Sequence, residues 1–291
     1  MNYQDSYSYN IEKNIKLHVE PSLFLQKKQI DIYYKIDKMD DVKNDDKLYL
    51  FQCYSWSFGH VLISCLINYS VYITYHDIFK DYIFSNIICG FKNHITDFME
   101  IIAKIENKKI YNLSKGDYYF KNIAYENIKV EYNKLFPTPL INMALEKIKH
   151  HIFEEKKAYP RKIAIIKTSS ILDGLKSVSR YFNKQKIMNI CKNTNYVLLD
   201  HENMNLQDIL LYIYNCNELL VSWGATAYFS IFLTNNQKCI CFSSHEYKSQ
   251  LNNENICFHK DLFPYKIIKK TISCTLNNDE CIFLENEIKK I

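Results

Sequence analysis

Residues 206–233 read LQDILLYIYNCNELLVSWGATAYFSIFL. Apolar residues recur at helical spacing in the first part, at Leu206, Ile209 and Ile213, and this spacing predicts a helix. The short apolar run LLVS at 219–222 predicts a buried strand, and the ATAYFSIFL that follows Gly224 predicts a second helix. We therefore expect a helix, a strand and another helix in direct succession.

The same alternation continues on both sides of this stretch. RKIAIIK at 161–167, YVLL at 196–199 and KCICFS at 238–243 predict strands, and NKQKIMNICKN at 183–193 predicts a helix. Strands that alternate with helices are typical of α/β proteins, in which a parallel sheet carries helices on both faces. We predict this fold class, with ligands bound beyond the carboxyl ends of the strands.

The first half predicts a similar sheet from fewer elements. LYLFQCYS at 48–55 and YIFSNIIC at 82–89 are typical of strands. HVLISCLINYSVYI at 60–73 and ITDFMEIIAKI at 95–105 are typical of helices. The first half is therefore expected to be α/β as well.

A chain of 291 residues is longer than one hydrophobic core usually supports, so we expect two domains. Between the halves, Pro137 and Pro139 precede a helical pattern that Pro160 follows, and this is the expected boundary. The predicted parts are an N-terminal α/β domain at 1–140, a linker helix at 141–160 and a C-terminal domain at 161–291.

The composition limits which binding partners can be expected. The formal net charge of +5 is spread along the chain without a block of Lys and Arg, so no nucleic-acid partner is expected. The first residues lack the apolar core of a signal peptide, and no run reaches about 18 apolar residues. We therefore expect no membrane insertion and a cytoplasmic location.

The ten cysteines are scattered, and several, such as Cys65, Cys216 and Cys241, stand inside apolar runs. This distribution favours reduced, buried thiols over a disulfide framework. The sequence has no CxxC pair, and His150 and His151 are adjacent without ligand spacing, so we expect no structural zinc and no bound metal.

Gly224 is one of only five glycines in 291 residues, and it separates a predicted strand from a predicted helix. A glycine there lets backbone N–H groups approach an anion at the helix N-terminus, where the helix dipole also favours negative charge. A phosphate-bearing ligand is one interpretation. A tight turn with Trp223 in the core is the other, and spacing alone does not separate them.

The C-terminal half resembles glycosyltransferase family 61, the group of capsular polysaccharide enzymes and EGF-domain O-GlcNAc transferases. In that family a strand ends in Ser-Arg, and an Arg-Arg-x-x-Asn-Glu motif follows downstream. Here Lys167 ends the strand in place of the arginine, and SRYFNKQKI keeps Arg180 and Asn183.

Two further segments carry the resemblance in the C-terminal half. The family has a Gln in the next helix and then Gly-x-His-Gly-Ala-x-x-x-Asn. This chain keeps Gln207 and the pair Gly224-Ala225, with Trp223 in place of the histidine.

One segment of the first half extends the resemblance to most of the chain. SFGHVLISCL resembles the family's Asn-Tyr-Gly-His-Phe-Leu-x-Glu/Asp-x-Leu and keeps Gly59 and His60. Ser64 replaces the acidic residue. The order and spacing of all the segments together carry the resemblance.

The resemblance implies a GT-B architecture, in which two Rossmann-like domains with largely parallel sheets face each other and the last helix can pack back on the first domain. It implies a hexosyl- or pentosyltransferase that uses a nucleotide-sugar, with a UDP-sugar as the expected donor, and a glycan or glycoprotein acceptor. Transfer is expected to invert the sugar and to need no metal or other cofactor. The expected setting is a bacterial cytoplasm or a viral factory in a host cytoplasm.

The resemblance also implies the site residues. His60 is the candidate general base, since His suits proton transfer near neutral pH, although it can equally cap its helix. Arg180 can clamp a phosphate bidentately, although a surface arginine at a helix cap is the alternative. From their position after a predicted strand, His245 and Glu246 can meet the donor's ribose or sugar hydroxyls, although they can equally be solvent-facing loop residues. The candidate donor-binding residues are Lys167, Arg180, Asn183, Ser222, Trp223, Gly224, Ala225, Thr226 and Glu246.

Two alternatives stay open. The replacements at Trp223, Ser64 and Lys167 favour a degenerate member that binds a nucleotide or glycan without turnover. An unrelated nucleotide-dependent α/β enzyme is the other alternative, although the sequence lacks a P-loop and a GxGxxG motif.

Overall fold

The computed structural model describes residues 9–24, 29–39, 45–51, 58–87, 94–113, 116–126, 138–153, 159–169, 181–234, 236–245, 265–268 and 270–290. The chain divides into two compact units, Met1–His151 and Ile152–Ile291. Each unit contains a sheet with helices, so the fold class is α/β.

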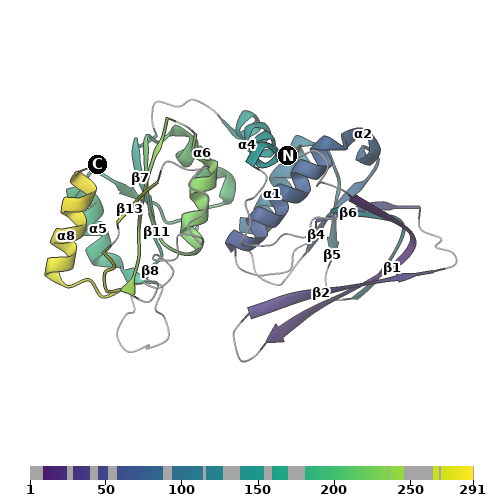
Figure 1. The fold of residues 1–291 in the computed structure, drawn as a ribbon, viewed down its shortest axis with the longest axis horizontal. Helices are drawn as coiled ribbons and strands as arrows, with labels where there is room; N and C mark the ends of the chain where they lie inside the picture. Colours follow the sequence, from purple (N-terminus) through teal and green to yellow (C-terminus); the bar gives the residue numbers. More distant parts are fainter. Residues whose placement is uncertain are drawn as a thin grey trace. The chain divides into compact units, whose positions relative to one another are not determined.

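The first unit contains a six-stranded sheet in the order β2-β1-β6-β3-β4-β5. Its strands are β1 Tyr9–Phe24, β2 Gln29–Lys38, β3 Lys47–Leu50, β4 Ile83–Ile87, β5 Ile110–Leu113 and β6 Gly116–Glu126. β1 pairs antiparallel with both β2 and β6, and the pairs from β6 to β5 are parallel. Figure 1 shows β1 and β2 in purple as the antiparallel end of this sheet.

The strands and helices predicted for the first half are present as β3, β4, α1 Phe58–Thr74 and α3 His94–Ile105, with the short α2 His76–Phe79 between them. The sheet of this unit is mixed, because β1 and β2 add an antiparallel ribbon to the parallel strands β6, β3, β4 and β5. The physical reason is a two-residue alternation in β1, which buries Ile15, Leu17 and Val19 and leaves the residues between them outside the core.

Helix α4 Thr138–Ile152 contacts the end of α3 through an ion pair between a partly exposed lysine and a buried glutamate. Lys147 Nζ lies 2.5 Å from Glu106 Oε1, which follows α3, and the Glu106 side chain is only 4% exposed. Tyr69 on α1 donates a hydrogen bond to the same carboxylate at 2.5 Å. A buried charge needs such partners, so these contacts hold α4 against α1 and the end of α3.

The second unit contains a five-stranded sheet in which every pair is parallel, in the order β10-β7-β11-β12-β13. Its strands are β7 Lys162–Ile165, β10 Val197–Leu198, β11 Glu218–Ser222, β12 Lys238–Phe242 and β13 Tyr265–Ile267. The two-residue strands β8 Thr168–Ser169 and β9 Phe182–Asn183 form a separate parallel pair. The strands predicted at 161–167, 196–199, 219–222 and 238–243 are confirmed.

Helices cover both faces of this sheet, as predicted. Figure 1 shows α5 Lys184–Asn193 and α8 Asn278–Lys289 on one side of it and α6 Leu206–Asn215 on the other. The segment predicted as a helix after Gly224 is a 3-10 helix, η2 Ala225–Phe232, rather than an α-helix. Six of its eight residues are buried, so this helix is enclosed nearly all round and not on one face alone.

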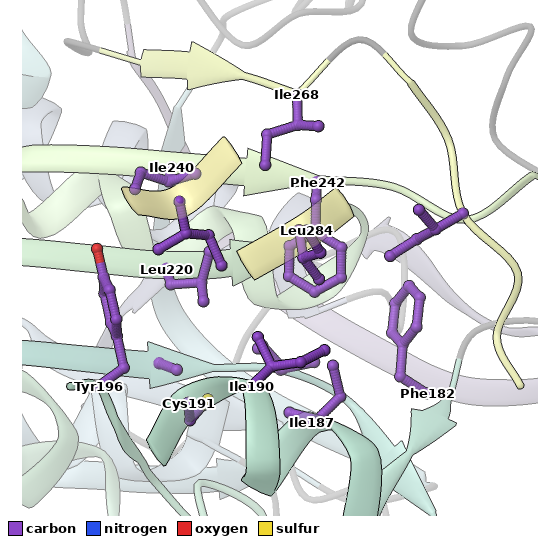
Figure 2. Close-up of a cluster of buried hydrophobic side chains, with 14 of the residues drawn as sticks. Phe182, Ile187, Ile190, Cys191, Tyr196, Leu220, Ile240, Phe242, Ile268 and Leu284 are labelled. Carbon is purple, nitrogen blue, oxygen red and sulfur yellow. The ribbon is translucent and has the colours of Figure 1, made fainter. Parts of the chain in front are cut away.

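The core of the second unit lies between the sheet and the pair α5 and α8. Figure 2 shows Leu220, Ile240 and Phe242 from the strands meeting Ile190 from α5 and Leu284 from α8. All five side chains are at most 1% exposed. This apolar layer fixes α5 against the sheet. It thereby holds the start of α5 near the ends of the strands.

The start of α8 is held by a capping box. Asn277 accepts from the amide of Glu280 at 2.9 Å, and the Glu280 carboxylate accepts from the amides of Asn277 and Ser273. The Ser273 hydroxyl donates to it at 2.5 Å, and His245 Nε2 lies 3.3 Å away. Burial raises the pKa of Glu280, but the hydrogen bonds from Ser273 and Asn277 outweigh burial and hold the pKa below its ordinary value.

This lowered pKa has a consequence for stability against pH. Because the folded pKa of Glu280 is below its unfolded value near 4.5, its contribution to stability is complete above that pH and is lost as the pH falls through the folded pKa. We expect Glu280→Gln to lower the free energy of unfolding at pH 7 by about 1 kcal/mol, and this deficit to shrink toward pH 3. Urea unfolding at a series of pH values measures it.

Asp279→Asn is the matched control, because Asp279 is an exposed neighbour on the same helix turn. It should change the pH dependence much less than Glu280→Gln. If the difference in free energy of unfolding between Glu280→Gln and the wild type stays constant from pH 7 to pH 3, the Glu280 carboxylate does not contribute to stability as proposed.

Candidate functional site

The order of the strands in the second unit creates a switch point between β7 and β11. The chain passes from β7 through α5 to β10 on one side, and then through α6 to β11 on the other side of β7. The two connections run in opposite directions across the sheet, and ligands of such sheets bind beyond the carboxyl ends of the strands at this point. The candidate site is therefore the edge where β7 and β11 end.

Two sequence-predicted residues meet at this edge. Lys167 follows β7 and Ser222 ends β11, and the amide of Lys167 lies 3.4 Å from the Ser222 hydroxyl oxygen, to which it donates. Trp223, Gly224 and Ala225 follow directly, so the structure brings these predicted residues to one strand edge.

Gly224 holds a backbone conformation that other residues avoid. Its φ is +117° and its ψ is −145°, and it immediately precedes η2. A Cβ built on it meets nothing within 4 Å, so conformation and not space is what requires glycine. Ala227 donates to the Gly224 carbonyl at 3.1 Å, and the amides of Ala225 and Thr226 precede that bond at the start of the helix.

We expect Gly224→Ala to destabilise the second unit by about 1–3 kcal/mol, because alanine at this φ is strained even though its methyl group has room. Urea unfolding of the full chain measures the loss. Ala225→Ser, one residue along, should stay within about 0.5 kcal/mol of the wild type. Equal stability of Gly224→Ala and wild type contradicts the strained conformation.

Ser222 and Thr226 hold the turn through their side chains. Both are buried, their hydroxyl oxygens are 2.9 Å apart, and Thr226 donates to the Ser222 carbonyl at 2.7 Å. The Trp223 amide donates to the Phe242 carbonyl at 2.7 Å, which ties the turn to the end of β12. Trp223 is half-buried rather than in the core. The hydroxyls of Ser222 and Thr226 thus shape the turn, and the backbone after Trp223 is the part that can meet a ligand.

Asn183 lies beside the end of β7 and caps α5. Its side chain accepts from the amide of Lys186 at 3.1 Å, and β9 pairs with β8 directly after Lys167. The Phe182 amide donates to the Lys167 carbonyl at 2.9 Å, and Lys167 Nζ lies 5.1 Å from the centre of the Tyr181 ring. Asn183 therefore organises the start of a helix next to Lys167.

The structure describes only some of the other predicted site residues. Arg180 and Glu246 lie outside the described residues. His60 is the third residue of α1 in the first unit, and its side chain is likewise outside the description. His245 follows β12, with Nδ1 2.9 Å from the Thr271 hydroxyl oxygen and Nε2 3.3 Å from Glu280 Oε1, so it joins the strand end to the cap of α8.

A cavity of about 420 Å³ lies on the β10 side of β7, and the sequence analysis did not find it. It adjoins the carboxyl ends of β7 and β10 and the first turns of α5. Its apolar wall consists of Ile166, Met188, Leu198 and Leu199. Its polar and aromatic lining consists of Thr168, Tyr181, Lys184, Asp200, His201, Glu202 and Asn203.

The sequence did carry a signal for this cavity. Asp200, His201 and Glu202 follow the predicted strand YVLL directly, which is where ligand-binding residues of a parallel sheet stand. His201 is buried, and its ring lies nearly perpendicular to that of Phe229 on η2 with centroids 6.3 Å apart, whereas Asp200 and Glu202 are exposed. Asn203 donates to Asp200 Oδ2 at 2.9 Å, which orients that carboxylate.

Within the described ranges, His, Cys, Asp and Glu side chains do not gather in threes as metal ligands do. Seven described cysteines are free thiols, and burial raises the pKa of Cys191 to about 12, so this thiol stays protonated at neutral pH. In the part of the chain that the structure describes, no helix combines the length and apolar character that crossing a membrane requires.

Comparison with known proteins adds no relative. No protein-family model matches the chain, and no curated protein matches it significantly.

Proposed function

We propose that the protein is a glycosyltransferase, which transfers a sugar from a nucleotide-sugar to a hydroxyl group of a glycan or glycoprotein, with inversion and without a metal ion. We also propose a GT-B architecture, in which the two units act as facing Rossmann-like domains. The motif resemblance to family 61 supports both proposals.

The observation that carries the proposal is the position of Lys167 and Gly224 at the switch point of a parallel sheet. A cation and a helix start preceded by glycine suit a diphosphate, because the ammonium group adds a positive charge and the first amides of a helix point outward as donors. Lys167 Nζ lies 5.1 Å from the centre of the Tyr181 ring, and Arg180, the second cation that the family resemblance implies, is the residue before Tyr181 in the sequence.

In the proposed reaction, the acceptor hydroxyl oxygen attacks the anomeric carbon of the sugar from the face opposite the nucleotide. The bond from that carbon to the diphosphate oxygen breaks, and the diphosphate leaves with the electron pair. His60 accepts the hydroxyl proton. Lys167, Arg180 and the amides after Gly224 stabilise the charge that develops on the leaving group.

A binding module without turnover is the second candidate. Three differences from the family motifs favour it, namely Trp223 in place of the histidine, Ser64 in place of the acidic residue and Lys167 in place of the arginine. It shares the donor site with the first candidate and differs only in the chemical step, so binding and turnover have to be measured separately.

A thermal-shift screen of the full chain against UDP-, GDP-, dTDP- and CMP-sugars tests the proposal. A ligand that binds the folded state raises stability by RT ln(1 + [L]/Kd), so one nucleotide class should raise Tm more than the others. Release of free sugar or transfer to an acceptor then separates an enzyme from a binding module. No rise in Tm with any of the four at millimolar concentration contradicts the proposed donor site.

We expect transfer to survive EDTA. The sequence has no Asp-x-Asp motif, and in the proposed site side-chain cations and helix amides stabilise the leaving diphosphate without a metal ion. Initial rates with and without EDTA should agree within about twofold, since an interaction lost in the transition state costs far more than that. Complete loss of activity that Mn²⁺ restores contradicts the metal-independent mechanism.

A further inference from the structure

We infer that the cavity on the β10 side of β7 holds the nucleoside of the donor, with its ribose hydroxyls on Asp200 and Glu202. The inference rests on the proposed function, since it concerns the donor of that reaction. It adds the part of the site that recognises the nucleoside, and it assigns the ribose hydroxyls to Asp200 and Glu202 rather than to Glu246, which the sequence had suggested for contacts to hydroxyls.

The cavity adjoins the proposed phosphate site through consecutive residues. Ile166 and Thr168 line it and flank Lys167 in the chain. Tyr181 also lines it, and Lys167 Nζ lies 5.1 Å from the centre of the Tyr181 ring. A ligand with phosphates at Lys167 therefore reaches the cavity with its next group, which in a nucleotide is the ribose.

The charges in the cavity lining are of both signs. Lys184 can pair with a phosphate, whereas Asp200 and Glu202 are carboxylates, which only accept hydrogen bonds when ionised and repel a phosphate. Their partner must donate, and the two neighbouring hydroxyls of a ribose do so. Asn203 holds one oxygen of Asp200 at 2.9 Å, so the carboxylate is oriented before a ligand arrives.

The apolar wall suits a nucleobase. Met188 on α5 is 45% exposed, which is unusual for such a side chain, and it lines the cavity together with Ile166 and Leu198. A planar base laid on this wall, with the Tyr181 ring beside it, buries the exposed Met188 surface. The volume of about 420 Å³ is within the range of small-ligand pockets, which run from about 300 to 1,000 Å³.

The opposite side of the sheet is arranged differently. His245, at the end of β12, has its two ring nitrogens within 3.3 Å of Thr271 and Glu280, so this histidine is engaged by the cap of α8. On the β10 side, by contrast, acceptor groups and an apolar wall surround an open volume. This contrast favours the β10 side for the nucleoside.

Isothermal titration of the full chain with UDP, GDP, ADP, CDP and inorganic pyrophosphate tests the inference. The double variant Asp200→Asn with Glu202→Gln should bind the preferred nucleoside diphosphate about tenfold or more weakly, because each change removes a charged acceptor. Pyrophosphate should bind the double variant as well as the wild type, which also shows that the variant is folded. Asp279→Asn, an exposed acidic residue outside the cavity, should bind like the wild type.

The 2′-deoxy form of the preferred diphosphate gives an independent measurement on the wild-type protein. It should bind more weakly than the ribose form, and the double variant should no longer distinguish the two. If the double variant binds the diphosphate normally, or if only Glu246→Gln weakens it, the inference is wrong while the proposed donor site stands. If none of the nucleoside diphosphates binds the wild type, the proposed function fails as well.

Discussion

Alanine at Arg180 should lower kcat for sugar transfer on the order of a hundredfold and also raise KM for the donor. The proposed guanidinium contact strengthens as charge develops on the leaving diphosphate, so its removal weakens the transition state more than the ground state. Loss of one such contact typically costs about 3 kcal/mol, which corresponds to about a hundredfold in rate. Steady-state kinetics with the donor found in the thermal-shift screen measures both constants.

The chain offers a matched control in its only other arginine. Arg161 precedes β7 at the amino end of the sheet, where its Nη1 donates to the Asn215 carbonyl at 3.3 Å. Arg161→Ala should therefore leave kcat and KM nearly unchanged. Arg180→Lys should recover only part of the activity, because an ammonium group carries the charge without the bidentate geometry.

Two companion variants separate the proposed roles. Lys167→Met keeps the apolar stem and removes the charge, so it should weaken donor binding and slow transfer. His60→Ala should reduce transfer while nucleotide affinity stays close to that of the wild type, since a general base acts on the acceptor.

If Arg180→Ala folds normally and keeps full donor affinity and turnover, the assignment of the segment around Arg180 to the donor site is wrong.

Phe242→Ala should destabilise the second unit by about 3–5 kcal/mol, which is the usual cost of removing a buried phenyl ring and leaving a cavity. Phe242 is 0% exposed, belongs to the cluster in Figure 2, and contacts the Phe182 ring with centroids 5.0 Å apart. It also ends β12, where its carbonyl accepts from the Trp223 amide. The loss should therefore loosen the candidate site as well as the core.

Hydrogen exchange in increasing urea measures this effect separately in each unit. Peptides from β7, β11 and β12 should lose protection at lower urea in Phe242→Ala, while peptides from β3 and α1 should not change. Ile282→Ala is the control, because Ile282 is 58% exposed on α8, and it should cost no more than about 0.5 kcal/mol. If the second unit of Phe242→Ala loses protection at the same urea concentration as the wild type, Phe242 does not stabilise this core as proposed.

The elements of the second unit could be read from the sequence because their patterns are local. Leu206, Ile209 and Ile213 are completely buried on one face of α6, and the apolar runs of β7, β11 and β12 fit strands that are covered on both faces. The first unit was harder to predict. β1 lies between β2 and β6, and Leu17 pairs with Tyr118 about a hundred residues away, so its partner cannot be identified from a local window.

The sequence by itself determined the α/β class, most of the helices and strands of the second unit, and the position of Gly224 between a strand and a helix, because each depends on residues close together in the chain. Only the tertiary structure decided the order β10-β7-β11, which makes the switch point, and the packing of α5, which leaves a cavity beside Asp200 and Glu202. It also decided that the Ser222 and Thr226 hydroxyls bond within the turn. These features depend on which strands become neighbours and on where side chains point once the core has closed, and hydrophobic periodicity specifies neither.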